Sequence, residues 1–197
     1  MTTSPLIVLE RAVDVHHRLD RAGVAHAIGG ALALAYHVAQ ARATNDIDLN
    51  VSADPKHPEA VFGLLPPDVP WTEGDVAAVR RDGQVRLLWP LPEGDGPAIP
   101  LDLFFPQHAL HAAIDARTEL VPMLDATVPI LSATDLLVFK ALFDRRKDWA
   151  DIEELVRFGK PDVAEARRWL TKIVGAKDHR LAALSEIVDE VTDGPSA

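Results

Sequence analysis

The sequence contains no cysteine, which excludes disulfide bonds and thiolate metal sites. No apolar run approaches the roughly 20 residues that a membrane-spanning helix needs. The first residues lack the basic segment, the apolar core and the cleavage site of a signal peptide. From these absences we expect a cytoplasmic protein with no membrane partner.

A surplus of positive charge is also lacking, because the formal net charge is −10. Proteins that bind nucleic acids usually have a basic face, so this balance counts against extensive contact with phosphates. The charge is uneven, however, since residues 140–180 hold 11 lysines and arginines against 8 acidic residues. Basic clusters at 145–147 and 167–168 could contact phosphates or could lie on solvated helix faces, and the sequence leaves both interpretations open.

The pattern of apolar residues predicts an α/β (α+β) core with a mixed sheet, followed by a helical part. The 197 residues suffice for one compact domain with a small helical appendage. In the core we expect helices at 6–22, 31–40 and 59–65, and strands at 24–28, 46–51, 76–80, 85–89 and 99–105. A capping box from Ser132 to Asp135 precedes helices expected at 136–143, 147–158, 162–174 and 178–191. The predicted division is a core of residues 1–130 and a helical C-terminal part of residues 131–193.

Asp46 and Asp48 lie two residues apart in a predicted strand, so their side chains share one face. Ile47 and Leu49 point the other way, into a core. Two adjacent carboxylates repel each other, and a divalent cation resolves that repulsion. Oxygen-only ligands suit Mg²⁺, which binds through one or two carboxylates together with substrate phosphates and waters. The pattern Asp-x-Asp is also common in exposed loops and strands, so alone it does not identify a metal site.

Gly29 and Gly30 follow a predicted strand and begin a predicted helix. Glycines at such a position let the backbone approach a phosphate closely, and the helix N-terminus offers free N–H groups and the positive end of its dipole. The alternative is a tight turn from strand to helix that binds no ligand.

Asp102 is a third candidate, and Leu101 and Leu103 flank it on a predicted strand. It could be a surface residue of an edge strand. If its strand instead lies next to that of Asp46 and Asp48, it would complete a metal site of three carboxylates.

The order of these residues resembles a known signature. The segment from Ile28 to Ala31 and the segment Arg-Ala-Thr-Asn-Asp-Ile-Asp-Leu at 42–49 together resemble the nucleotidyltransferase motif of the polymerase-β superfamily. The form Arg-x-Thr-x-Asp-Ile-Asp-Leu resembles, more narrowly, the AbiEii/MenT group of toxin-like nucleotidyltransferases. The segments 139–140 and 148–155 are similar to the lysine-bearing helix and the acidic segment of that group. The resemblance covers residues 26–156.

The resemblance implies a polymerase-β-like nucleotidyltransferase core and an enzyme that depends on a pair of Mg²⁺ ions. Asp46, Asp48 and Asp102 would be the metal ligands, and metal pairs of this kind steady both oxygens of an in-line displacement. Asp102 would also help to remove a proton from the acceptor hydroxyl. Asp148 and Asp151, which lie on one helix face, would belong to the catalytic site.

Binding of an NTP substrate is implied as well. Gly29 and Gly30 would hold the triphosphate, and Lys140 would reach it to offset its charge. Without the resemblance, Lys140 is a surface lysine that pairs with the acid four residues later. Arg42 would contact phosphate and Thr44 would hydrogen-bond near the metal, or both would only shape the turn before the strand.

The resemblance further implies a toxin of a toxin–antitoxin system. Such a protein transfers nucleotides, often pyrimidines, from an NTP to the 3′ acceptor end of tRNA, blocks translation and has a cognate antitoxin protein as partner. A second interpretation is an aminoglycoside or lincosamide nucleotidyltransferase, because an acidic cleft suits a cationic drug. A third is a catalytically inactive binding protein of the same fold, against which the full set of three carboxylates argues.

Overall fold

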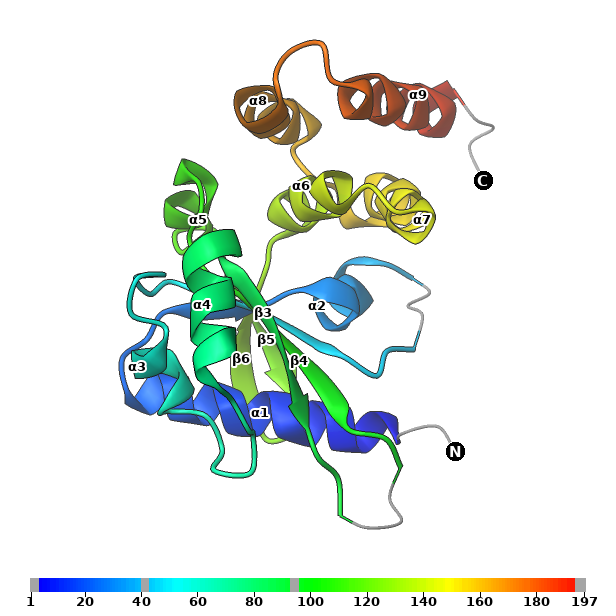
Figure 1. Cartoon of the computed structure of the whole chain (residues 1–197). Coiled ribbons are helices and arrows are strands. Elements are labelled where there is room, and N and C mark those ends of the chain that lie inside the picture. Colours follow the sequence, from blue (N-terminus) through cyan, green and yellow to red (C-terminus); the bar gives the residue numbers. More distant parts are fainter. Residues whose placement is uncertain (1–3, 40–42, 93–95, 194–197) are drawn as a thin grey trace. The chain divides into compact units, whose positions relative to one another are not determined.

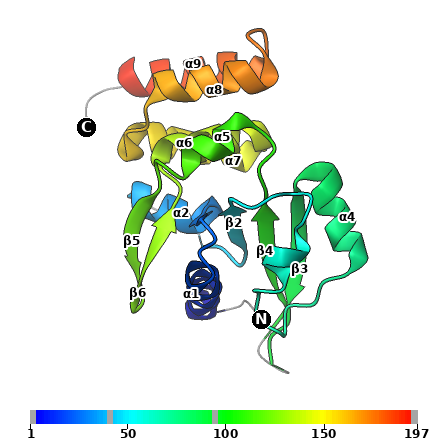
Figure 2. The same ribbon diagram turned by 90° about the vertical axis from the view of Figure 1, so that its left-hand side faces the viewer.

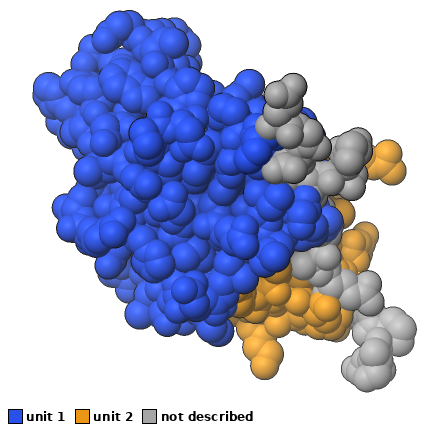
Figure 3. All heavy atoms as spheres, turned by 90° about the horizontal axis from the view of Figure 1, so that it is seen from below, with its two compact units in different colours: residues 1–32, 42–130 blue, residues 33–41, 131–197 orange. Residues whose placement is uncertain are grey.

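The chain, in a computed structural model that describes residues 4–39, 43–92 and 96–193, forms two compact units (Figure 3). The first, which we call the sheet unit, comprises residues 1–32 and 42–130. The second, which we call the helical unit, comprises residues 33–41 and 131–197. Helix α2 (Gly30–His37) therefore begins in the sheet unit and ends in the helical unit.

A six-stranded sheet is the framework of the sheet unit (Figure 1). Its strand order is β3-β4-β2-β1-β6-β5. Strand β2 pairs in parallel with β4 and antiparallel with β1, and β1 pairs in parallel with β6. The prediction of an α/β core with a mixed sheet is therefore confirmed. The strands are β1 (His26–Ile28), β2 (Ile47–Val51), β3 (Gln84–Trp89), β4 (Ile99–Phe104), β5 (Glu119–Met123) and β6 (Ala126–Ile130).

Helix α1 (Pro5–Arg21) packs against β1 and β6 of this sheet (Figure 2). It buries Val8, Ala12, Val15 and Leu19, whose spacing places them on one helical face. Fully burying a side chain such as Leu19 contributes about 1.5–3 kcal/mol. The helix expected at 6–22 is therefore confirmed. The other helices of the sheet unit are α3 (Glu59–Phe62), α4 (Glu73–Asp82) and α5 (Ala109–Ile114).

The segment 76–80, predicted as a strand, is part of helix α4. Thr72 and Asp75 form a capping box, in which the Thr72 backbone N–H donates to Asp75 Oδ2 at 2.7 Å and Thr72 Oγ1 accepts from the Asp75 N–H at 3.4 Å. Gly83 ends the helix in the left-handed conformation, with φ +66°. The prediction was wrong because the valines of this segment favour strands in isolation, while the residues on either side define a helix. The strand expected at 85–89 is confirmed by β3.

The hairpin of β5 and β6 at one end of the sheet was not predicted, nor was α5. Pro122 and Pro129 lie within its strands. Proline has no N–H to donate to a neighbouring strand, so it indicates a loop or an edge strand. Strand β5 is indeed an edge strand, which explains how Pro122 is accommodated. Leu124 makes the turn between the two strands with φ +54°.

The described part of the helical unit is built from helices joined by short connections, as predicted. Ser132 Oγ accepts a hydrogen bond from the Asp135 N–H at 3.2 Å and so caps α6, which packs against α7, α8 and α9. No helix in the described ranges has both the length and the hydropathy needed to cross a membrane. The elements are α6 (Ala133–Phe143), α7 (Arg146–Glu154), a π-helical turn (Leu155–Gly159), α8 (Val163–Val174) and α9 (His179–Asp193).

The capping box of α4 predicts a stability difference between two variants of Thr72. Thr72→Ala removes the side-chain acceptor and lowers the free energy of unfolding by about 1 kcal/mol, whereas Thr72→Ser retains the hydroxyl and changes it by much less. Urea denaturation followed by circular dichroism measures both. Equal stability of the two variants would show that the hydroxyl does not hold the start of α4.

Candidate active site

The turn between β1 and α2 lies directly against Asp48. Gly29 donates its backbone N–H to the backbone oxygen of Asp48 at 2.8 Å. Gly30 has φ +56°, in the left-handed region that side chains other than glycine rarely adopt. A Cβ atom on Gly30 would also clash with Oδ2 and Cγ of Asp48. Position 30 therefore requires glycine for two reasons, its backbone conformation and the carboxylate that fills the adjacent space.

Asp48 and Asp102 are register partners in the parallel pair of β2 and β4. Register partners on adjacent strands project from the same face of a sheet. Strand β4 lies between β2 and β3, so the interpretation of Asp102 as an edge-strand residue is wrong. Ile47 and Leu49 are buried on the opposite face, as the alternation predicted. The sheet therefore places two of the three candidate acids side by side.

Asp46 stands immediately before β2, which begins one residue later than predicted. Thr44 Oγ1 donates a hydrogen bond to the Asp46 carboxylate and so holds its side chain. Asp46 and Asp48 are both half-buried. Arg42, the other predicted phosphate contact of this segment, lies outside the described residues.

Arg86 on β3 is a residue of this face that the sequence interpretation missed. It is the register partner of Asp102. Its guanidinium donates two hydrogen bonds to the Asp102 carboxylate, from Nε to Oδ1 at 2.7 Å and from Nη2 to Oδ2 at 2.6 Å. These hydrogen bonds raise the pKa of Arg86, and the charges of Asp102, Asp46 and Asp48 add to the effect. The alternation of polar and apolar residues along β3 could have placed Arg86 on a polar face, but not beside Asp102.

The three acids fit a Mg²⁺ ion in donor type and in charge. Asp46, Asp48 and Asp102 offer only carboxylate oxygens, the ligands that Mg²⁺ prefers. As placed within residues 4–39, 43–92 and 96–193, no three His, Asp or Glu side chains are gathered closely enough to hold a metal ion. The acids nevertheless already have a positively charged neighbour. Arg86 forms an ion pair with Asp102 and interacts favourably with the charges of Asp46 and Asp48. Each oxygen of Asp102 therefore already accepts one hydrogen bond from Arg86.

Lys140 and Asp151 form a buried ion pair within the helical unit. Lys140 Nζ lies 2.6 Å from Asp151 Oδ2, and the two side chains are 4% and 10% exposed. The interpretation of Lys140 as a surface lysine is therefore wrong. Burial removes the hydration of both charges, so each depends on the other for its stabilisation. Whether Lys140 also contacts a triphosphate stays a prediction.

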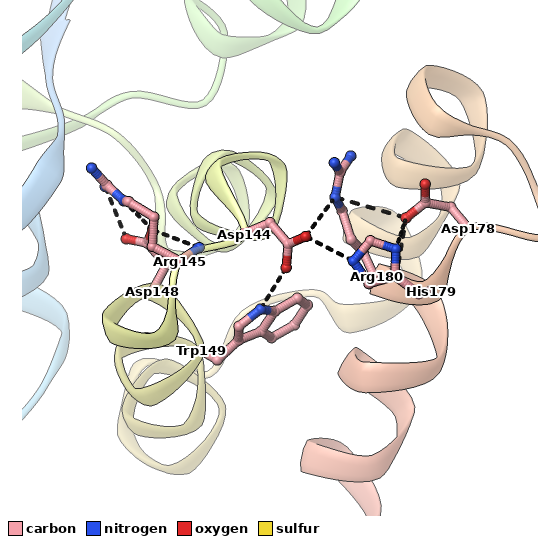
Figure 4. Close-up of polar contacts among 7 residues, drawn as sticks. All are labelled: Asp144, Arg145, Asp148, Trp149, Asp178, His179 and Arg180. Carbon is pink, nitrogen blue, oxygen red and sulfur yellow. Dashed lines mark hydrogen bonds and ion pairs between the residues drawn. The ribbon is translucent and has the colours of Figure 1, made fainter.

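Asp144, the acid four residues after Lys140, has other partners (Figure 4). It ends α6 in the left-handed conformation, with φ +56°. Its carboxylate accepts hydrogen bonds from Trp149 Nε1 at 2.8 Å and from His179 Nε2 at 2.7 Å. The bond from Trp149, followed by that from His179, lowers the pKa of Asp144. Asp144 therefore links the end of α6 to α7 and to α9.

Asp148 is fully buried and interacts with Arg145 at the start of α7 (Figure 4). Its Oδ2 accepts hydrogen bonds from Arg145 Nε at 2.5 Å and from the Arg145 backbone N–H at 3.3 Å. A carboxylate in the first turn of a helix is also favoured by the helix dipole. The structure thus gives Asp148 a local role in capping α7, and its predicted catalytic role stays a prediction.

Solved structures of similar fold include nucleotidyltransferase-like proteins. An antigenic nucleotidyltransferase-like protein from Paracoccidioides brasiliensis is 16% identical, with a TM-score of 0.58 over 97% of this chain and 91% of that chain. A putative nucleotidyltransferase from Helicobacter pylori is 12% identical, with a TM-score of 0.50 over 100% of this chain and 100% of that chain. No protein-family model and no curated protein matches the sequence. The chain therefore has the fold of nucleotidyltransferase-like proteins, as the resemblance predicted, and the likeness is one of fold.

The contact between Gly30 and Asp48 predicts that two glycines of similar conformation respond differently to alanine. Gly23 has φ +69° and open space around its Cβ position, so Gly23→Ala costs only the backbone strain of about 1–2 kcal/mol. Gly30→Ala meets the carboxylate in addition and costs about 1–3 kcal/mol more. Chemical denaturation measures both free energies of unfolding.

A double-mutant cycle isolates the steric part of this difference. Adding Asp48→Ala to Gly30→Ala removes the clashing carboxylate, so the cost of Gly30→Ala falls towards that of Gly23→Ala. If Gly30→Ala is equally costly with and without the Asp48 carboxylate, the close contact does not determine the requirement for glycine.

Proposed function

We propose that the protein is a Mg²⁺-dependent nucleotidyltransferase that transfers a nucleotide from an NTP to an acceptor hydroxyl. One observation carries the proposal: a glycine turn at the start of α2 is fitted against Asp48, which stands in register with Asp102 on the adjacent strand. The turn offers a place for phosphates and the acids offer a place for the cation that accompanies them. The fold of nucleotidyltransferase-like proteins supports the same activity.

Gly29 and Gly30 would have different roles in binding the triphosphate. The N–H of Gly29 is already bonded to the Asp48 backbone, so Gly29 fixes the turn. The free N–H groups at the start of α2, from Gly30 onwards, would then bind phosphate oxygens, since the first N–H groups of a helix have no partner within it. Arg42, which precedes β2, would add a positive charge to the same phosphates.

The acids would hold the metal and handle the proton. Mg²⁺, as a pair of ions held by Asp46, Asp48 and Asp102, would offset the negative charge of the reacting phosphates. Thr44 would keep Asp46 turned towards its ligand position through the hydrogen bond that it donates. An oxygen of Asp102 would accept the proton of the acceptor hydroxyl as that hydroxyl attacks the α-phosphorus atom of the NTP. The bond from this phosphorus to the β-phosphate oxygen would break, and pyrophosphate would leave.

As acceptor we propose the 3′ end of tRNA, with a pyrimidine NTP as donor, so that the protein would be a cytoplasmic toxin with a cognate antitoxin partner. The AbiEii/MenT-like order of residues at 42–49 supports this choice, and so does the basic surplus of residues 140–180. Part of that surplus is engaged locally, because Arg145 pairs with Asp148 and Arg168 with Glu165. Arg146 is exposed, and we take it as a better candidate for a phosphate contact than Arg145 or Arg168.

The acceptor is identified by incubating the protein with Mg²⁺, each α-labelled NTP in turn, and either total tRNA or a panel of aminoglycosides and lincosamides. Label that appears on tRNA supports the proposal, and a preference for CTP or UTP supports the pyrimidine donor. Label on an antibiotic instead would assign the protein to drug modification. Absence of transfer to every acceptor contradicts the enzymatic proposal.

The role of Asp48 predicts a selective loss of transfer. Asp48→Asn removes one metal-binding charge and lowers the rate of transfer on the order of 10²-fold or more. The matched control is Asp125→Asn, which makes the same charge change at an exposed residue of the β5–β6 turn in the same unit and leaves the rate unchanged. Thermal unfolding checks that both variants are folded. A parallel fall in both rates would remove the case for Asp48.

The burial of Lys140 and Asp151 predicts the stability of variants that remove one or both of their charges. Lys140→Met alone leaves the Asp151 carboxylate buried without this cation and lowers the free energy of unfolding by about 3–5 kcal/mol. The double variant with Asp151→Leu restores most of that stability, because two apolar side chains of similar size replace the pair.

The rate of nucleotide transfer by the double variant then tests whether Lys140 also contributes to catalysis. If Lys140 offsets the charge of the triphosphate, the stable double variant transfers more slowly than the wild type and its KM for NTP is raised. Wild-type activity in the stable double variant would show that the pair serves only the packing of α6 against α7.

A further inference from the structure

Arg86 is a cation bonded to one of the three candidate acids. Its guanidinium engages both oxygens of Asp102, at 2.7 and 2.6 Å, in a two-pronged ion pair. The Asp102 side chain is 12% exposed while that of Arg86 is 57% exposed, so the arginine reaches over the acid from the solvent side. A carboxylate bonded through both oxygens has fewer lone pairs left for a metal ion.

The charge of Arg86 is permanent and acts on the whole group of acids. A guanidinium does not lose its proton in proteins, so Arg86 cannot release Asp102 by deprotonation. Its positive charge is stabilised by Asp46 and Asp48 as well as by Asp102. The register of β3 and β4 fixes this arrangement, because Arg86 and Asp102 are paired across the two strands.

We propose that Arg86 is the resident counter-ion of the carboxylate site and competes with the divalent cation for Asp102. Without a metal ion, the arginine neutralises Asp102 and weakens the repulsion among the three acids. A divalent cation that uses Asp102 as a ligand displaces at least part of this bidentate contact. Arg86 therefore sets the affinity of the site for metal ions, as a positioning residue that acts through Asp102. This inference rests on the proposed function, because it takes the three acids as metal ligands.

The expected effect is a gain in metal affinity when Arg86 is removed. Arg86→Gln frees both oxygens of Asp102 and removes one positive charge, so Mn²⁺ binds about ten- to a hundredfold more tightly than to the wild-type protein. Arg86→Lys keeps the charge but loses the two-pronged geometry, and its affinity lies between the two. The matched control is Arg81→Gln, an exposed arginine of α4 that pairs with Asp82 and leaves the affinity unchanged.

The experiment is a titration of the whole protein with Mn²⁺ in the absence of NTP, followed by electron paramagnetic resonance of the free ion and by calorimetry. Thermal unfolding with and without Mn²⁺ is a second readout. The metal raises the Tm of Arg86→Gln by more than that of the wild type, because the ion replaces the lost counter-charge. This second readout also serves if Arg86→Gln is less stable than the wild type without metal.

A background of Asp102→Asn tests whether the effect passes through that acid. In this background Arg86→Gln changes the affinity for Mn²⁺ much less, because only the effect of its charge on Asp46 and Asp48 remains. Equal or weaker binding of Mn²⁺ by Arg86→Gln overturns the inference, and so does a gain that is undiminished with Asp102→Asn. An unchanged affinity in Asp48→Asn would count against the proposed metal site itself, and absence of Mn²⁺ binding by both the wild type and Arg86→Gln would overturn both proposals.

Discussion

The parallel register of β2 and β4 is the constraint on which the candidate site depends. On one face of these strands, Ile47, Leu49, Leu101 and Leu103 are at most 1% exposed. The acids project from the other face because successive side chains of a strand alternate. A slip of one residue in β4 would turn Asp102 into the core and its leucines out of it, which the burial of these side chains strongly disfavours. The hydrophobic core therefore determines which carboxylates meet.

This arrangement brings negative charges close together, and the apolar packing on the opposite face of the sheet does nothing to reduce their repulsion. Asp48 and Asp102 stand on adjacent strands, and Asp46 precedes the first of them. Their mutual repulsion opposes folding, and the side chain of Arg86 offsets it from the third strand of the row. Positive charge beside Asp102 stabilises the sheet, and a bound divalent cation would supply charge of the same sign at the same place. In the absence of a metal ion, Arg86 supplies this charge.

Local patterns in the sequence were enough to predict β2, the glycine turn and the helices of the helical unit, because each has its signal within a few residues. The alternation around Asp48 and the cap at Ser132 are examples. The pairing of Arg86 with Asp102 has no such signal, since it arises only when β3 and β4 align. The burial of Lys140 likewise depends on how α6 packs against α7. Strand pairing and helix packing are long-range, and a single sequence does not display them.

The aspartates of the two units differ in whether a structural role explains their presence. In the helical unit, Asp148 caps α7 and Asp151 neutralises Lys140, so helix formation and packing account for both carboxylates. In the sheet unit, Asp48 imposes a cost, because its position against the turn restricts residue 30 to glycine in a left-handed conformation. Local features that cost stability persist where a ligand or a reaction requires them. The contact between Gly30 and Asp48 is such a feature, and it supports the proposal of an active site in the sheet unit more strongly than the number of acidic residues does.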